Sequence, residues 1–278
     1  MKKIIICADD YALSPGVSRG IRELLELRRI SATSVMTLGA AWPTEARSLQ
    51  AFANQADIGL HFTLTDLKPL TAMPKFAPNN KLPSLGKIIR MAYSRTLPLD
   101  EIAAELLRQF TTFIEYFGTL PTHLDGHQHI QLLPGIREII IKLYQRHCNN
   151  SAIYIRNCGL NYRQILQQTA IIKPSVLNLM GLVLKKQLLQ HNIPTNHDFT
   201  GVYDFFASKI NYPHIFTKFL DITQENTMIM CHPGYVDSEL EQLDPVTQQR
   251  AVELKFFKST QFHNMLAEKN ITLYTDQI

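Results

Sequence analysis

The sequence lacks several features that would mark particular classes of protein. No stretch reaches the ~18 uncharged apolar residues that a spanning helix needs, so we expect no transmembrane segment. The apolar part of the amino terminus is too short for a signal peptide. Lysine and arginine never run beyond pairs, so the net charge of +4 does not indicate nucleic-acid binding. These absences favour a cytoplasmic globular protein.

Paired cysteines and the common nucleotide or serine-hydrolase motifs are also missing. The four cysteines show no CxxC spacing, and we expect them to be reduced packing residues. No GxSxG, P-loop or Rossmann glycine pattern occurs, which argues against serine hydrolases and common nucleotide enzymes. Trp42 is the only tryptophan, so aromatic platforms of the kind found in sugar-binding modules are scarce. Any chemistry must come from other side chains.

Apolar runs and amphipathic stretches alternate along the chain, which predicts strands alternating with helices. The expected strands cover residues 4–8, 33–38, 58–64, 122–130, 152–156, 227–231 and 271–274. The expected helices begin after Ser14, near 43, 99 and 134, and at Asp244, from which one long final helix is expected. This alternation indicates a parallel sheet, and with 278 residues we predict a single α/β domain. Its architecture is expected to be a (β/α) barrel, incomplete or distorted relative to a TIM-type barrel.

Two long segments interrupt the alternation. Residues 66–98 hold five prolines and little periodicity, which predicts a loop insertion over the strand ends. Residues 157–200 are expected to form a mostly helical insertion. Its apolar segment from Val176 to Leu184 favours a lid or a subunit contact, and so a homodimer, over a membrane anchor.

A histidine-rich run at Thr122–Ile130 is the densest group of metal-competent side chains. If the run is an extended strand, its period of two places His123, Asp125, His127 and His129 on one face. Four such side chains on one face are hard to explain as packing. A histidine-rich turn leading into the next helix is the alternative.

Other polar residues follow the expected strands at the point where each strand ends. They are Asp9 and Asp10 after strand 4–8, His61 near the end of strand 58–64, Arg156 after strand 152–156, and His232 after strand 227–231. Because ligands of α/β folds bind at the carboxyl ends of the strands, these residues and the histidine-rich run are expected to form one site.

One carboxylate and two imidazoles form a ligand set that holds a divalent metal and leaves positions open for water and substrate. We therefore assign Asp10, His61 and His127 to a metal. Asp9 is the candidate general base, and His232 is the candidate acid that protonates a leaving group. By donor chemistry alone, zinc suits this set at least as well as magnesium.

The remaining polar residues leave alternatives open. His129 or Arg156 could bind substrate, and His123 is expected to be structural or to support a ligand. Asp125 could join Asp9 as the carboxylate pair of a glycosidase. A phosphoester hydrolase would need more basic clamps than Arg156 offers, and a non-catalytic sugar-binding protein would need no water-activating set.

Taken together, the motifs resemble those of the YdjC-like carbohydrate deacetylases, also called the ChbG/HpnK family, and within it the chitooligosaccharide deacetylases. The resemblance covers most of the chain up to about residue 235. The matching motifs are Ala8–Gly16 (ADDYALSPG), Gly59–Thr65 (GLHFTLT), Lys68–Pro74 (KPLTAMP), Pro121–His129 (PTHLDGHQH) and Cys231–Gly234 (CHPG).

This resemblance implies a barrel-like fold and hydrolysis of the N-acetyl group of an amino sugar. It also implies a divalent metal, usually magnesium, held by residues that map onto Asp10, His61 and His127. Two positions depart from the family pattern: Ala12 stands where glycine is frequent, and Gln131 stands where many members carry a further histidine. If position 12 needs a positive φ, alanine would strain the loop there by ~1 kcal/mol.

Overall fold

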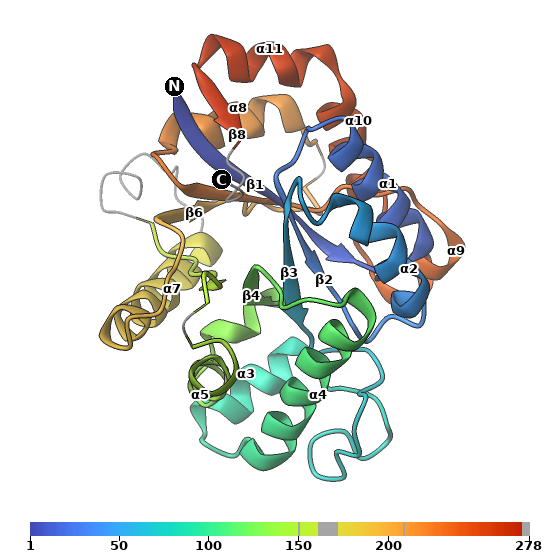
Figure 1. Ribbon diagram of the computed structural model, residues 1–278, viewed down its shortest axis with the longest axis vertical. Helices are drawn as coiled ribbons and strands as arrows, with labels where there is room; N and C mark the ends of the chain where they lie inside the picture. Colours follow the sequence, from blue (N-terminus) through green and yellow to red (C-terminus); the bar gives the residue numbers. More distant parts are fainter. Residues whose placement is uncertain (150, 161–171, 208, 274–278) are drawn as a thin grey trace.

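The computed structural model describes the chain except residues 150, 161–171, 208 and 274–278. Its strands form one sheet in the order β5-β4-β3-β2-β1-β7-β6, with β8 paired to β1, and every pair is parallel. Helices surround this central sheet (Figure 1). Among the described residues β5 and β6 are the ends of the path, so the barrel stays open. The prediction of an incomplete parallel (β/α) barrel is therefore confirmed.

The strands of the sheet are short except for the first. Their bounds are β1 Lys2–Tyr11, β2 Ala32–Val35, β3 Asp57–Phe62, β4 His123–Gly126, β5 Tyr154–Ile155, β6 Asp198–Thr200, β7 Thr227–Cys231 and β8 Ile271–Leu273. The strand predicted at 227–231 matches β7. The residue Tyr274, expected to end the last strand, lies outside the described residues.

The helices connect successive strands and cover the outside of the sheet (Figure 1). Their bounds are α1 Pro15–Glu26, α2 Trp42–Leu49, η1 Gln50–Phe52, α3 Leu85–Tyr93, α4 Leu99–Phe117, η2 His127–Leu132, α5 Ile136–His147, α7 Ile172–Gln190, α8 Tyr212–Ile222, α9 Ser238–Leu243, α10 Gln248–Lys258 and α11 Thr260–Glu268. Within the described part of the chain, none of these helices has the length and apolarity needed to cross a membrane.

Two helix boundaries follow directly from local chemistry. The side chain of Ser14 accepts a hydrogen bond from the Val17 amide, and Pro15 opens α1 with its fixed φ, as predicted. Helix α4 ends where Gly118 adopts a φ of 91° in the left-handed region.

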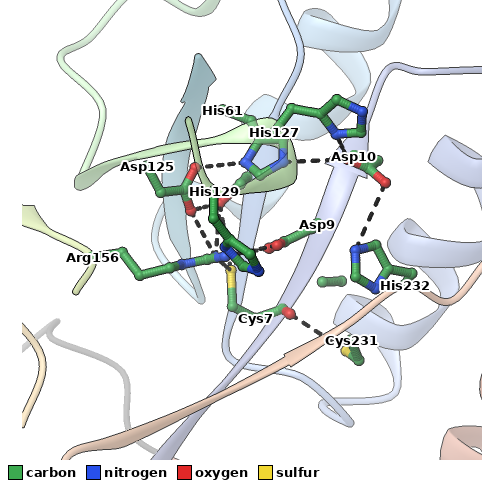
Figure 2. Close-up of polar contacts among 12 residues, drawn as sticks. Cys7, Asp9, Asp10, His61, Asp125, His127, His129, Arg156, Cys231 and His232 are labelled. Carbon is green, nitrogen blue, oxygen red and sulfur yellow. Dashed lines mark hydrogen bonds and ion pairs between the residues drawn. The ribbon is translucent and has the colours of Figure 1, made fainter. Parts of the chain in front are cut away.

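The end of β1 differs from the prediction. The acidic pair Asp9 and Asp10 was expected in a loop, but β1 continues through it to Tyr11. The pairing register with β2 shifts between Ala8 and Tyr11, and Asp10 has a φ of 71°. Ala12 has a φ of 70°, so the position at which the family often has glycine does require the left-handed region. This irregular backbone directs the two carboxylates toward the other polar side chains of the cluster (Figure 2).

Three other expectations about elements were wrong. The histidine-rich strand ends at Gly126, because Gln128 and His129 have φ values of 54° and 60° and start the turn of η2. The loop expected at 66–98 contains helix α3. The single long helix expected after Asp244 is instead divided into α10 and α11, because the helix breaks at Ser259, which caps α11. Of the helical insertion expected at 157–200, residues 161–171 lie outside the description, α7 is helical, and β6 is a strand.

A close contact between β3 and β4 fixes their packing at the site. A Cβ placed on Gly59 would lie 2.2 Å from Nε2 of His123, whose ring is fully buried and stacks on Tyr154 at 5.1 Å. Only glycine at position 59 therefore leaves room for the His123 ring to pack against β3.

We predict that Gly59→Ala lowers the free energy of unfolding by about 1–3 kcal/mol, because the added methyl group must displace a buried ring. Gly86→Ala is the matched control: its Cβ would meet nothing within 4 Å, and it lies in α3. The control should be neutral or stabilising by up to ~1 kcal/mol. Urea denaturation of both variants measures the difference, and equal stabilities would contradict this packing argument.

Candidate metal and catalytic site

The polar residues selected from the sequence meet at the carboxyl ends of the parallel strands. Figure 2 shows these side chains converging from β1, β3, the β4–η2 turn, and the ends of β5 and β7. The residues brought together are Asp9, Asp10, His61, His127, His129, Arg156 and His232. They form one cluster, as expected for ligand-binding residues in an α/β fold.

Asp10, His61 and His127 form a compact group of donor atoms. The His127 Nδ1 atom lies 2.9 Å from Asp10 Oδ1, and the His61 Nε2 atom lies 3.3 Å from the same oxygen. One donor atom from each residue lies within 4.8 Å of the others. His127 is the most accessible of the three, with 16% of its side chain exposed. A carboxylate and two imidazoles at this spacing fit a divalent cation with positions left for water and substrate.

Asp125 orients one of these imidazoles. Its Oδ1 lies 2.6 Å from His61 Nδ1, which leaves His61 Nε2 to face Asp10. The other oxygen of Asp125 accepts a hydrogen bond from Ser34 Oγ at 2.5 Å. Histidines that bind metals typically hold a carboxylate with their second nitrogen, because this fixes the ring and its tautomer. The surroundings of His61 therefore support metal binding.

Asp9 is held by a buried arginine. Arg156 Nη1 donates to Asp9 Oδ2 at 2.6 Å and Nη2 donates to Oδ1 at 2.7 Å. The same Nη2 lies 2.7 Å from Asp125 Oδ2, and the Arg156 side chain is fully buried. Burial opposes ionisation of Asp9, but the guanidinium lowers the pKa of this carboxyl below its usual value. The buried Arg156 guanidinium thus contacts the carboxylates of both Asp9 and Asp125.

A second group of donors, Cys7, His123 and Asp125, is also close enough to hold a metal. Here, however, Arg156 Nη2 already lies 2.9 Å from Cys7 Sγ and bonds to Asp125. A guanidinium supplies the positive charge, so we assign no metal to this group. His123 is a buried packing residue beside Ser34, 2.9 Å from its hydroxyl.

Arg250 on α10 is a site residue that the sequence did not reveal. Its Nη2 donates to Asp10 Oδ2 at 2.6 Å and to Asp244 Oδ2 at 2.5 Å, and its side chain is buried. The Oδ1 atom of Asp10 therefore faces the two histidines, while its Oδ2 atom accepts the hydrogen bond from Arg250. Burial alone would raise the pKa of Asp10, but His127 and Arg250 keep that pKa well below its usual range.

His232 lies at the opposite side of Asp10, with its Nε2 4.0 Å from Asp10 Oδ2. Its backbone N–H donates to Glu253 Oε2 at 2.6 Å, and the hydroxyl of Tyr203 also donates to Glu253. Burial, opposed by Asp10, lowers the pKa of His232, while burial raises that of Glu253 to about 7. The His232 ring is 15% exposed and can therefore meet a ligand. No pattern in the sequence marked Glu253.

His129 faces the site from the turn after Gly126 (Figure 2). Its Nδ1 lies 3.6 Å from Cys158 Sγ, and its ring packs edge-on against Phe199 at 5.5 Å. Burial and the nearby Arg156 charge lower the pKa of His129 to about 3, so the ring is neutral at pH 7. A neutral imidazole can donate or accept one hydrogen bond to a polar ligand.

The cluster carries a nearly balanced set of buried charges. Asp9, Asp10 and Asp125 are buried, and the pKa of each carboxyl is lowered by neighbouring cations despite the opposing effect of burial. The guanidiniums of Arg156 and Arg250 offset two of these three negative charges. The third negative charge can be balanced by a proton on a histidine or by a bound cation.

Comparisons with known proteins agree with this fold. The sequence model described as YdjC-like protein matches residues 3–268. A Citrobacter koseri protein named chitooligosaccharide deacetylase is 31% identical over 275 residues, covering 97% of this chain and 96% of that protein. A Salmonella heidelberg protein of the same name is 31% identical over 271 residues, covering 96% and 94%. An Enterococcus faecalis V583 crystal structure, provisionally described as a cellobiose-phosphate cleavage protein, shares the fold with a TM-score of 0.75 at 20% identity, covering 99% of this chain and 97% of that one.

The protonation of His61 gives a testable prediction about metal binding. Burial disfavours its charged form, but Asp125 and Asp10 raise the pKa of His61 to about 10. The metal-free protein then carries an imidazolium at pH 7, and a cation must displace this proton to reach Nε2. We expect Zn²⁺ uptake to release about one proton per ion and the affinity to rise about tenfold per pH unit above pH 7. Calorimetry in buffers with different ionisation enthalpies measures the release, and a value near zero would contradict the assignment of His61.

The orienting role of Asp125 gives a second prediction. Asp125→Asn removes the charged acceptor at His61 Nδ1, so we expect affinity for Zn²⁺ to fall about 10- to 100-fold while Asp9 still pairs with Arg156. Asp66→Asn, at an exposed loop position, is the matched control and should bind like the wild type. Thermal melting of the metal-free proteins checks that both variants fold. Unchanged affinity in folded Asp125→Asn would overturn the orienting role.

Proposed function

The chain belongs to the YdjC-like protein family, and we propose that it is a metal-dependent hydrolase that removes the N-acetyl group from an amino sugar and releases acetate. The relatives named chitooligosaccharide deacetylase make an acetylated chito-oligosaccharide the substrate class of choice. The observation that carries the proposal is the position of Asp9, held by Arg156, next to the donor group Asp10, His61 and His127.

Asp10, His61 and His127 would hold the divalent cation. When bound there, such an ion polarises an acetamide carbonyl and makes a nearby water more acidic. The family resemblance favours magnesium, whereas two imidazoles and one carboxylate suit zinc equally well. Arg250 and Asp125 keep two of the three ligands in place, so their orientation does not depend on the ion.

Asp9 would act as the general base. Arg156 occupies one lone pair on each Asp9 oxygen, which keeps the carboxylate ionised and fixed and leaves other lone pairs able to accept a proton. Water adds to the acetamide carbon, and its proton moves to Asp9. Arg156 is fully buried, and we therefore reassign it from substrate binding to positioning of Asp9.

His232 would protonate the departing nitrogen as the C–N bond breaks, which yields acetate and a free amine. Burial lowers the pKa of His232, but the Asp10 carboxylate opposes this shift and so favours the imidazolium that donates the proton. The bond from its backbone to Glu253 holds the residue at the end of β7. His129, neutral and directed into the site, is the candidate for a hydrogen bond to the substrate.

The rival hydrolytic functions fit the site less well. A glycosidase would need Asp125 free to face a substrate, but Asp125 is fully buried against His61, Ser34 and Arg156. A phosphoester hydrolase would need unpaired basic side chains, but Arg156 and Arg250 are both engaged by carboxylates. A non-catalytic sugar-binding protein would not need a base beside a metal-competent group.

We also propose how the protein is organised. One sheet takes strands from both halves of the sequence, which supports a single domain. Helix α7 exposes Leu179 and Leu189 by 65% and 62%, which supports a contact with a second copy of the chain. All four cysteines are free and buried, as is usual in the reducing cytoplasm.

The proposal predicts that two variants fail in different ways. Asp9→Asn should bind Zn²⁺ like the wild type but release acetate about 100-fold more slowly or worse, because the base is lost. His127→Ala should lose both metal binding and turnover. Acetate release from N-acetylglucosamine oligomers, acetylated lipid sugars and acetylated nucleotide sugars, with and without chelator, is the measurement. Full activity in chelator-stripped protein, or no acetate from any of these substrates, would refute the proposed function.

A further inference from the structure

The segment that follows β6 brings aromatic side chains to the edge of the site. Gly201 has a φ of 114°, and a Cβ on it would lie 2.2 Å from the Met230 carbonyl oxygen of β7. The chain therefore leaves β6 in close contact with β7, the strand that delivers His232. We call residues 202–207 the β6 loop.

The β6 loop is fastened to the same residue that holds His232. The Tyr203 hydroxyl donates to Glu253 Oε1, while the His232 amide donates to Oε2 of the same carboxylate. The rings of Tyr203 and Phe205 pack at a centroid distance of 4.5 Å. Phe205 in turn meets the His232 ring at 5.2 Å and a right angle. One side of the loop is thus fixed against the candidate acid.

The other side of the loop presents Phe206 to solvent. Its side chain is 68% exposed, although Phe205 beside it is half-buried. Its amide donates to Asp204 Oδ1, which shapes the backbone into a local turn. A ligand that covers this ring removes apolar surface from water and so gains affinity.

The single exposed aromatic ring of the loop favours a sugar as its ligand. The other exposed residues of the loop, Asp204 and Ala207, are not large apolar residues, so the loop offers a ligand one exposed aromatic ring. A hexopyranose ring has a face of C–H groups and a rim of hydroxyls. The C–H face can cover one aromatic ring while the hydroxyls remain in water.

We propose that Phe206 forms a second sugar subsite, on which the ring next to the acetylated one stacks, and that Phe205 borders the reacting acetamide beside His232. The proposal rests on the proposed deacetylase function. It makes an oligosaccharide, rather than a single amino sugar, the substrate that the site binds best. Stacking on Phe206 therefore strengthens binding only of substrates that have a second sugar ring next to the acetylated one.

The test compares Phe206→Ala and Phe206→Trp, with Tyr116→Ala as the control. Tyr116 is an aromatic residue on α4 with 40% exposure, on the other side of the molecule from β6 (Figure 1). For N,N'-diacetylchitobiose we expect Phe206→Ala to raise KM about tenfold, with kcat within about twofold. Phe206→Trp and Tyr116→Ala should stay near the wild type. For monomeric N-acetylglucosamine, the Kd from calorimetry should be the same in all four proteins, because no second ring is present.

An equal loss of affinity for monomer and dimer in Phe206→Ala, or no loss for either, would overturn the subsite. Calorimetric titration with the dimer separates this result from failure of the deacetylase function. If the wild type binds the dimer more tightly than Phe206→Ala but releases no acetate, the subsite stands and the reaction is refuted. If the wild type does not bind the dimer, the subsite is refuted as well.

Discussion

The guanidinium of Arg156 is the group on which the site depends. It contacts Asp9 and Asp125 at 2.6–2.7 Å, and all three side chains are buried. A buried carboxylate that loses its partner destabilises a protein by about 3–5 kcal/mol, so neither acid could remain ionised there alone. Asp125 then orients His61, and Asp9 lies beside the metal-competent group. One buried cation thus fixes both the candidate base and, through Asp125, one candidate metal ligand.

The balance of charge leaves room for one more positive charge in this cluster. The carboxylates of Asp9, Asp10 and Asp125 face two guanidiniums, and the raised pKa of His61 lets its imidazolium supply the missing positive charge. A divalent ion at the proposed site would have to displace this proton. Metal and proton would then compete for the same nitrogen, and occupancy of the site would depend on pH.

Much of the fold and of the site could be predicted, because both follow from the parallel sheet. Continuous apolar runs such as residues 227–231 mark buried strands, and the polar residue that follows each run must lie at the common carboxyl edge. This logic brought Asp10, His61 and His127 together although they are far apart in sequence. This logic failed where the backbone dihedral angles determine the end of a strand. The period-two pattern through His129 gave no sign that Gln128 and His129 adopt positive φ and end the strand.

The contributions of α10 lay beyond sequence reasoning for a different reason. Arg250 and Glu253 are three residues apart and so share one face of that helix, where charged residues ordinarily face solvent. Here that face is buried: Arg250 holds Asp10, while Glu253 holds His232 and Tyr203. Only the position of α10 beside the carboxyl ends of β1 and β7 gives these side chains their roles. Because one helix face fixes a metal-competent carboxylate, the candidate acid and the aromatic loop, a shift of α10 would move all three together.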